Sequence, residues 1–289
     1  MLRNAVALAS IAILAGCGSA AGSGPTAPGP LFAPGSAINY TAMGASDAIG
    51  VGASVFCFPF VDCPDGRGYV HVAVRELRAR GFTVNLANLG IPATVLSRRI
   101  QNLGAQYGRT IPGNFHDQQM PFVLDTANLI TIFAGINDVD TIIAAVGGGA
   151  AGADQAGYIT SQIQAFGQDF ATLVRTVRER ARSARVIVLN LPNMAGMPRF
   201  ANFPVQHRRA AQMLSVGITA TAINQYVTQG IVVVDLMCDP RSYEPSTYSG
   251  DGFHPSDTGY AWMAAEVVAA ATTSYRTPAA GCAHTSLVN

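Results

Sequence analysis

The sequence contains no lysine, so all 18 of its basic residues are arginines. Without a lysine amine, the chain can form neither a Walker-type phosphate-binding loop nor a Schiff base through lysine. Charged residues make up 12% of the chain and the formal net charge is +1, which lacks the basic excess typical of nucleic-acid binding. With 49% hydrophobic residues, the 289-residue chain has the composition of a packed globular protein and no nucleic-acid partner is expected.

The first 16 residues are predicted to be a secretory signal peptide. They hold one cation, Arg3, and an apolar run over residues 5–15 that is too short to span a bilayer. The stretch Leu14–Cys17 resembles the lipobox of bacterial lipoproteins, in which the cysteine becomes the lipidated first residue of the mature chain. An ordinary signal peptide cut a few residues later is the alternative. We therefore expect an exported protein that is anchored to the cell envelope through Cys17, facing the periplasm or on the outer membrane, or is secreted.

Residues 17–36 are rich in Gly, Ser, Ala and Pro and are predicted to be a flexible tether. Residues 37–289 would then form one domain, whose contact with a membrane depends on the lipid alone. The sequence leaves its oligomeric state open.

Four further cysteines, Cys57, Cys63, Cys238 and Cys282, form an even set in a chain that is expected to be exported. This favours two disulfides over free thiols, among three possible connectivities. Nearness in sequence favours Cys57–Cys63 and Cys238–Cys282. A metal site is disfavoured, because the cysteine spacings are irregular and the histidines show no ligand pattern.

From residue 37 onward, short β-branched runs alternate with longer segments of helical period, which predicts one doubly wound α/β domain with a parallel sheet. The predicted strands are Ile38–Met43, Thr83–Leu89, Asn128–Phe133, Arg185–Leu189 and Ile231–Asp235. The predicted helices are Gly68–Arg80, Thr94–Tyr107, Tyr158–Arg182, Val205–Gln229 and Ser256–Thr273.

Two stretches are predicted to be loops. Ile142–Gly157 contains three consecutive glycines and follows the third strand, where α/β proteins keep loops that contact ligands. Pro192–Phe203 follows the fourth strand and carries two methionines and two phenylalanines, which either line an apolar pocket or pack down as anchors of the loop.

Four small clusters each fall where chemistry is expected, at the carboxyl edge of the sheet or at the start of the last helix. They are Gly44-Ala45-Ser46-Asp47, Asn88-Leu89-Gly90, Gly135-Ile136-Asn137-Asp138 and Asp251-Gly252-Phe253-His254-Pro255. Taken alone, the first could be a helix N-cap and the next two could be turns. The last places a carboxylate three residues before a histidine, where a turn can bring it to the imidazole Nδ1 and leave Nε2 free as a base.

In this order, the four clusters resemble the four sequence blocks of the SGNH, or GDSL-type, hydrolases, over roughly residues 38–272. The first block departs from the usual wording at Ala45 and Ala48, and neither position is the nucleophile. The resemblance implies a three-layer α/β/α flavodoxin-like fold with a five-stranded parallel sheet in the order 2-1-3-4-5. An ordinary α/β-hydrolase fits less well, because Ser46 lacks the full G-x-S-x-G motif.

The resemblance also implies a role for each matching residue. Ser46 would be the nucleophile, His254 the general base and acid, and Asp251 the carboxylate that orients the imidazole. The oxyanion hole would combine the backbone N–H groups of Ser46 and Gly90 with the side-chain amide of Asn137. No metal or organic cofactor is implied.

These roles describe a serine carboxylic-ester hydrolase that acts through an acyl-enzyme on short or medium acyl esters, with a small-molecule or lipid ester as its substrate. A carbohydrate acetyl esterase and an acyltransferase on the same fold are alternatives. The lone tryptophan, Trp262, provides no evident platform for stacking on a sugar. A non-catalytic envelope lipoprotein that uses the fold as a binding module is a further alternative.

Overall fold

The computed structural model describes residues 27–61 and 63–289, and the expected signal peptide and Cys17 lie outside these residues. Five strands form one parallel sheet in the order β2-β1-β3-β4-β5, which confirms the predicted fold class. Their bounds are β1 Ala37–Met43, β2 Thr83–Asn88, β3 Leu129–Ile132, β4 Arg185–Leu189 and β5 Val232–Val234.

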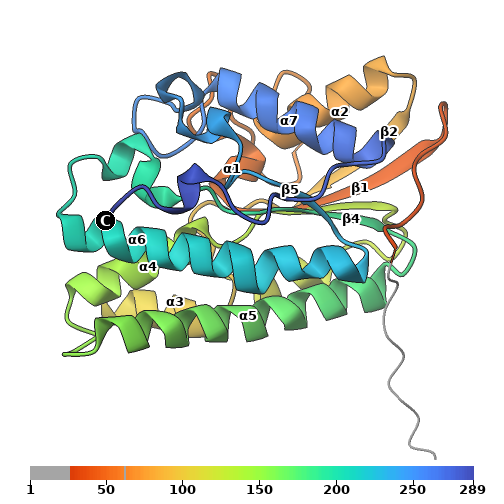
Figure 1. Cartoon of the computed structure of the whole chain (residues 1–289). Helices are drawn as coiled ribbons and strands as arrows, with labels where there is room; N and C mark the ends of the chain where they lie inside the picture. The colour runs from red at the N-terminus through yellow and green to blue at the C-terminus, as the bar shows by residue number, and fades with distance from the viewer. Residues whose placement is uncertain (1–26, 62) are drawn as a thin grey trace, which may run out of the picture.

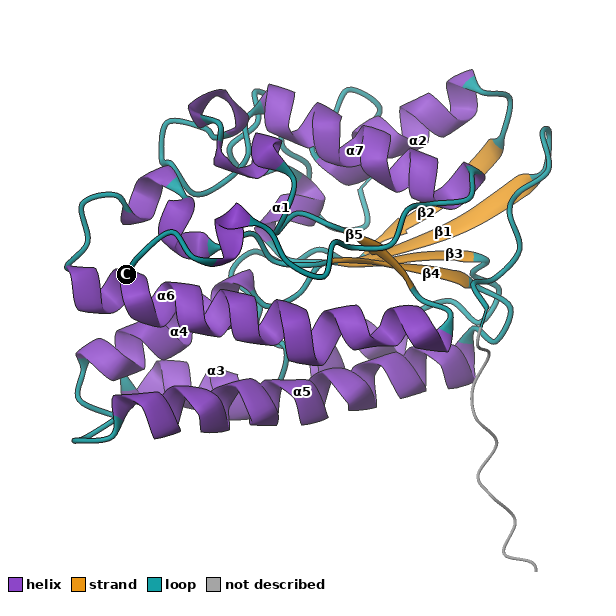
Figure 2. Cartoon of the chain, in the orientation of Figure 1, coloured by secondary structure: helices purple, strands orange, loops and turns teal. Residues whose placement is uncertain are grey.

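Helices cover both faces of this sheet, so the domain has three layers (Figure 1). On one face lie α1 Ser46–Ile49, α2 Tyr69–Ala79 and α7 Asp257–Thr272. On the other face lie α3 Arg98–Gln106, α4 Ile136–Gly147, α5 Gln155–Arg180 and α6 Val205–Gly217. Figure 2 shows the strands enclosed between the two helical layers, an arrangement that parallel sheets require because both of their faces are apolar.

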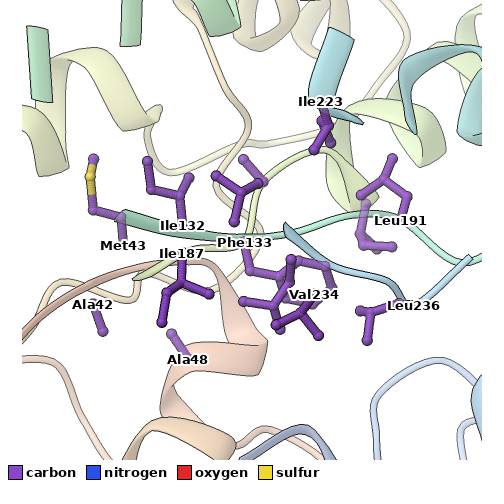
Figure 3. Close-up of a cluster of buried hydrophobic side chains, with 14 of the residues drawn as sticks. Ala42, Met43, Ala48, Ile132, Phe133, Ile187, Leu191, Ile223, Val234 and Leu236 are labelled. Carbon is purple, nitrogen blue, oxygen red and sulfur yellow. The ribbon is translucent and has the colours of Figure 1, made fainter. Parts of the chain in front are cut away.

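The hydrophobic core runs through the sheet and reaches both helical layers. β3 and β4 are buried at every position, as expected for the middle strands of a parallel sheet. Figure 3 shows Ile132, Ile187 and Val234 from three neighbouring strands, with Ala48 of α1 on one side of the sheet and Ile223 on the other.

The third crossover differs from the prediction of one helix preceded by a loop. Residues 136–147 of the supposed turn and loop form α4, and α5 begins at Gln155, so the predicted loop Ile142–Gly157 shrinks to residues 148–154. Glycine has a low helix propensity, so the three consecutive glycines favoured a loop over a helix for the apolar residues before them. In the structure, Ile142 and Ile143 of that helix are buried in the core.

Two other predicted helices are shorter than expected. α3 begins at Arg98 rather than at Thr94, and α6 ends at Gly217, after which Ile218–Ile223 forms a π-helical turn and Asn224–Gln229 a 3₁₀ helix. The predicted loop Pro192–Phe203 contains two 3₁₀ turns. Its side chains Met194, Met197 and Phe200 are buried, so they anchor this loop.

Both predicted disulfides are present. Cys57–Cys63 closes a small loop after α1, and Cys238–Cys282 ties the segment after β5 to the C-terminal tail. Within residues 27–61 and 63–289, no helix combines the length and apolar character needed to cross a bilayer.

Candidate active site

Ser46 stands at the carboxyl end of β1, where the chain turns directly into α1. Ser46 is almost fully buried. Because it is the first residue of that helix, its N–H has no acceptor within the helix. The alternative role as N-cap does not apply, because Ala45 holds that position and no side-chain capping bond forms. The turn is tight: a Cβ on Gly44 would lie 2.7 Å from the Cβ of Ala48, so small residues are needed on both sides of the serine.

A glutamine far along the chain fixes the turn before the serine. The side chain of Gln119 is fully buried, accepts from the N–H of Gly44 at 3.0 Å and donates to its carbonyl at 2.8 Å. Both backbone groups of Gly44 are therefore held by one side chain. No motif in the sequence points to Gln119, because this contact spans 75 residues and belongs to no short pattern.

His254 joins the serine to a carboxylate, although Ser46 lies 208 residues away in the chain. Its Nε2 is 3.0 Å from Ser46 Oγ, and its Nδ1 is 2.6 Å from Asp251 Oδ2. An imidazole held at Nδ1 by a carboxylate presents Nε2 to the hydroxyl as a proton acceptor. The structure thus brings together the three side chains that the sequence assigned to the nucleophile, the base and the orienting acid.

The carboxylate of Asp251 is held in place by several donors. Its Oδ1 accepts from the N–H groups of Phe253 and His254 at 2.8 and 2.9 Å and from Ser249 Oγ at 2.8 Å. Although partial burial raises the pKa of Asp251, the hydrogen bonds from the His254 ring, these two N–H groups and Ser249 together hold that pKa well below its ordinary value. Asp251 is therefore ionised at neutral pH.

Gly90 follows β2, the strand next to β1, and its turn packs against α1. A Cβ at this position would lie 2.7 Å from the Cβ of Ala48 and 3.1 Å from the carbonyl oxygen of Ala45. The N–H of Gly90 donates to Asn88 Oδ1 at 3.1 Å, and Asn88 Nδ2 donates to the carbonyl of Ala48 at 2.8 Å. In the free protein, Asn88 thus occupies the donor that the sequence assigned to the oxyanion hole and ties the Gly90 turn to α1.

Asn137 lies in the first turn of α4, at the carboxyl end of β3 on the other side of β1. Its Nδ2 donates to the carbonyl of Thr94 at 3.0 Å, and the residue is 8% exposed. A primary amide carries two N–H groups, so the bond to Thr94 fixes the side chain while the second N–H remains available to a ligand. Gly90 and Asn137 therefore flank the serine turn from the two neighbouring strands.

The next residue, Asp138, holds the loop that follows Gly90. It is fully buried, and both of its carboxyl oxygens accept from the N–H of Leu96, at 3.0 and 3.2 Å. Burial raises the pKa of Asp138 to about 7, and the Leu96 hydrogen bond opposes this rise. No sequence motif points to a separate role for Asp138, since an aspartate in the first turn of a helix is common.

A small pocket of about 30 Å³ lies beside Asp47, the residue after the serine. Apart from Asp47, its lining is mainly hydrophobic and includes Phe133, Met197, Phe253 and Trp262. Burial raises the pKa of Asp47, while the neighbouring His254 lowers it. Met197, one of the buried anchors of the Pro192–Phe203 loop, thus also lines this pocket.

The fold is a three-layer α/β/α domain, and a hydrogen-bonded serine–histidine–aspartate arrangement lies at the carboxyl edge of its sheet. The model of the GDSL-like lipase/acylhydrolase family matches residues 42–262, which contain Ser46, Gly90, Asn137, Asp251 and His254. The chain therefore belongs to the GDSL-like lipase/acylhydrolase family.

Solved structures of similar fold include two lipases. The lipase Lip_vut3 from a goat rumen metagenome is 20% identical, with a TM-score of 0.56 over 82% of this chain and 98% of that chain. The extracellular lipase of Streptomyces rimosus is 17% identical, with a TM-score of 0.53 over 81% of this chain and 100% of that chain. At these identities the likeness shows the shared fold. A comparison with curated proteins found no match.

Proposed function

We propose that the protein is a serine carboxylic-ester hydrolase that acts through an acyl-enzyme on short or medium acyl esters. The observation that carries the proposal is the continuous hydrogen-bonded chain from Ser46 Oγ through the His254 ring to Asp251. Membership of a lipase/acylhydrolase family supports ester hydrolysis as the reaction.

In the proposed mechanism, His254 Nε2 takes the Ser46 hydroxyl proton while Oγ attacks the ester carbonyl carbon. The negative charge on the carbonyl oxygen is stabilised by the N–H groups of Ser46 and Gly90 and by the amide of Asn137. The C–O bond to the alcohol then breaks, and the alcohol leaves with the proton that His254 returns. Water attacks the acyl-enzyme in the same way and releases the acid and the free serine.

Formation of the oxyanion hole requires one rearrangement. The Gly90 N–H is bonded to Asn88 Oδ1 in the free protein, so the substrate oxygen must share or replace that acceptor. A developing oxyanion is a stronger acceptor than a neutral amide oxygen, which favours the exchange in the transition state. The contact with Asn88 keeps this turn in place until the substrate binds.

The surroundings of Trp262 support an acyl ester over a sugar ester as the substrate. Trp262 lies under the guanidinium of Arg241 at 4.9 Å, so its ring is not presented as an open platform for a sugar. A carbohydrate acetyl esterase therefore remains the second candidate, tested by the same experiment.

Hydrolysis of p-nitrophenyl esters from acetate to palmitate tests the proposal, with the chain from residue 18 onward compared with its Ser46→Ala variant. We expect activity that is lost in the variant, and a profile over chain length that reports the size of the acyl pocket. A folded wild-type protein that cleaves neither these esters nor acetylated sugars would refute the proposal.

We also propose that the protein is exported and carries a lipid on Cys17, which lies outside the described residues. Two disulfides support an oxidising compartment. Radiolabelled palmitate fed to an expressing bacterium should label the wild-type protein and not a Cys17→Ala variant. Equal labelling of both would contradict the lipid anchor, whereas a secreted and unlabelled wild-type protein would favour the ordinary signal peptide.

A further inference from the structure

Large exposed hydrophobic side chains gather in one part of the described structure. Residues 27–61 and 63–289 expose eleven such side chains, and seven of them lie on the segments Val55–Val61 and Phe122–Leu124. These seven, here called the phenylalanine patch, are Val55, Phe56, Phe58, Phe60, Val61, Phe122 and Leu124. The rings of Phe60 and Phe122 lie 5.9 Å apart, so the two segments form one surface. Apolar clusters of this kind mark interaction sites more often than isolated exposed residues do.

Five of the seven patch residues lie in the segment Val55–Val61, whose conformation is constrained. The disulfide Cys57–Cys63 closes the loop, and Arg75 Nη1 donates to the carbonyls of Pro64 and Gly66 at 2.8 and 2.6 Å. At its tip, Phe60 has a φ of +59°, a conformation that non-glycine residues rarely adopt. A strained residue persists only where its surroundings determine it, so the chain holds this aromatic side chain out toward solvent.

The patch lies next to the candidate active site. Its loop continues directly from α1, which begins with Ser46, and a Cβ at Gly52 would lie 2.7 Å from the Cβ of His254. On the other side, the N–H of Phe60 donates to the carbonyl of Asn88 at 3.3 Å, and the side chain of Asn88 accepts from Gly90. The patch therefore continues the surface that a substrate must approach.

The chemistry of the patch fits a lipid surface. The segments Val55–Val61 and Met120–Leu124 contain no charged residue, and four exposed phenylalanines are side chains suited to the boundary between headgroups and acyl chains. The N-terminal chain permits this contact. The Gly29 carbonyl accepts a hydrogen bond from Arg185 at the start of β4. When fully extended, the residues from Cys17 to Gly29 can span at most about 40 Å. The helix α5 is about 39 Å long, so this span is as long as the longest helix of the domain.

We propose that the phenylalanine patch docks the domain on a lipid surface and so presents Ser46 to esters held in that surface. The proposal rests on the proposed ester hydrolysis for its purpose, and on the exposed aromatic loop for its physical basis. It names lipid esters, rather than esters free in water, as the substrate class of this site.

Flotation with phosphatidylcholine vesicles tests the proposal, using the chain from residue 18 onward, which carries no lipid. We expect the wild-type protein to float with the vesicles, and the double variant Phe58→Ser, Phe60→Asn to bind at least tenfold more weakly. Asparagine is chosen at position 60 because it tolerates a positive φ. Val205→Ser with Met213→Ser removes two exposed apolar side chains on α6 and should change binding less than twofold.

Each variant is first melted to show that it folds, so that lost binding cannot reflect unfolding. The Ser46→Ala variant separates the two proposals: it should float like the wild type while it hydrolyses nothing. If the wild type floats with the vesicles but hydrolyses no ester, the proposed function is refuted while the docking proposal is still supported. The docking proposal is overturned if the wild type stays off the vesicles, if the Phe58/Phe60 variant floats equally well, or if the patch instead joins two copies of the chain in lipid-free solution.

Discussion

Replacement of Asn137 by alanine tests how the oxyanion is stabilised. The two N–H groups of the Asn137 amide have separate roles in our account: one donates to the Thr94 carbonyl at 3.0 Å, and the other donates to the substrate oxygen. Alanine removes both. The first loss affects the stability of the fold, the second affects the reaction, and the two can be measured separately.

The expected loss in turnover is large. Removal of one oxyanion donor typically lowers kcat by about 10²–10³-fold, which corresponds to about 3–4 kcal/mol of transition-state stabilisation. KM should change little, because the amide binds the tetrahedral oxyanion more strongly than the ester carbonyl. The Thr94 carbonyl loses a buried donor, which should lower the free energy of unfolding by about 1–3 kcal/mol.

Turnover of p-nitrophenyl butyrate measures the first effect, and urea unfolding measures the second. The matched control is Thr141→Val, one turn further along α4, which removes a buried hydroxyl that donates to the Asn137 carbonyl but leaves the amide intact. We expect that variant to keep kcat within threefold of the wild type. An Asn137→Ala enzyme that also stays within threefold would refute the role of the amide, whatever its stability.

Three further predictions concern the orienting acid, the disulfides and a buried carboxyl group. Asp251→Asn should lower kcat by roughly 10³–10⁴-fold, because an amide at the 2.6 Å contact favours the wrong histidine tautomer; ester turnover checks this, and an active variant contradicts it. Removal of Cys238–Cys282, which closes a loop of 44 residues, should lower the free energy of unfolding by about 4 kcal/mol. Removal of Cys57–Cys63, which closes a loop of 6 residues, should lower it by about 2 kcal/mol. The variant without Cys238–Cys282 should therefore have the lower melting temperature, and the reverse order would contradict this prediction. Burial raises the pKa of Asp138 in the folded protein to about 7. Between about pH 4 and 7 the folded protein therefore binds more protons than the unfolded chain, so this group makes the free energy of unfolding fall as the pH rises through that range. Asp138→Asn should abolish this part of the slope in urea unfolding, and an unchanged slope would contradict the raised pKa.

The sheet was predictable because its signal is local and repeated. Each strand is a short β-branched run at the point where the helical period stops, and the structure confirms all five. Their order is the one that the family resemblance implies, since local patterns do not specify which strands pair. The α4 helix was not predictable in the same way. Its residues 136–147 combine a motif typical of turns with a glycine run, and only the packing of Ile142 and Ile143 into the core decides for a helix.

For the candidate site, the sequence could predict residue types and their order, but not the contacts between distant segments. A serine after β1 and a histidine before α7 were visible as motifs. The bond from Gln119 to the Gly44 turn was not, because it joins residues 75 positions apart and lies in no pattern. The bond between Gly90 and Asn88 was also missed, since a motif shows which residues are present and not which donors are already occupied.

Three aspartates near the site show how its environment separates chemically identical groups. Asp47 and Asp138 are buried, and burial raises the pKa of each, which favours their neutral forms. Asp251 is the most exposed of the three and has its pKa lowered by the donors that surround it. The ionised carboxylate of Asp251 lies 2.6 Å from Nδ1 of His254, on the side of the ring away from Ser46. In the proposed reaction, the imidazole takes the serine proton and its new positive charge faces that ionised carboxylate, so the resting protein already holds the charges in the arrangement that this proton transfer requires.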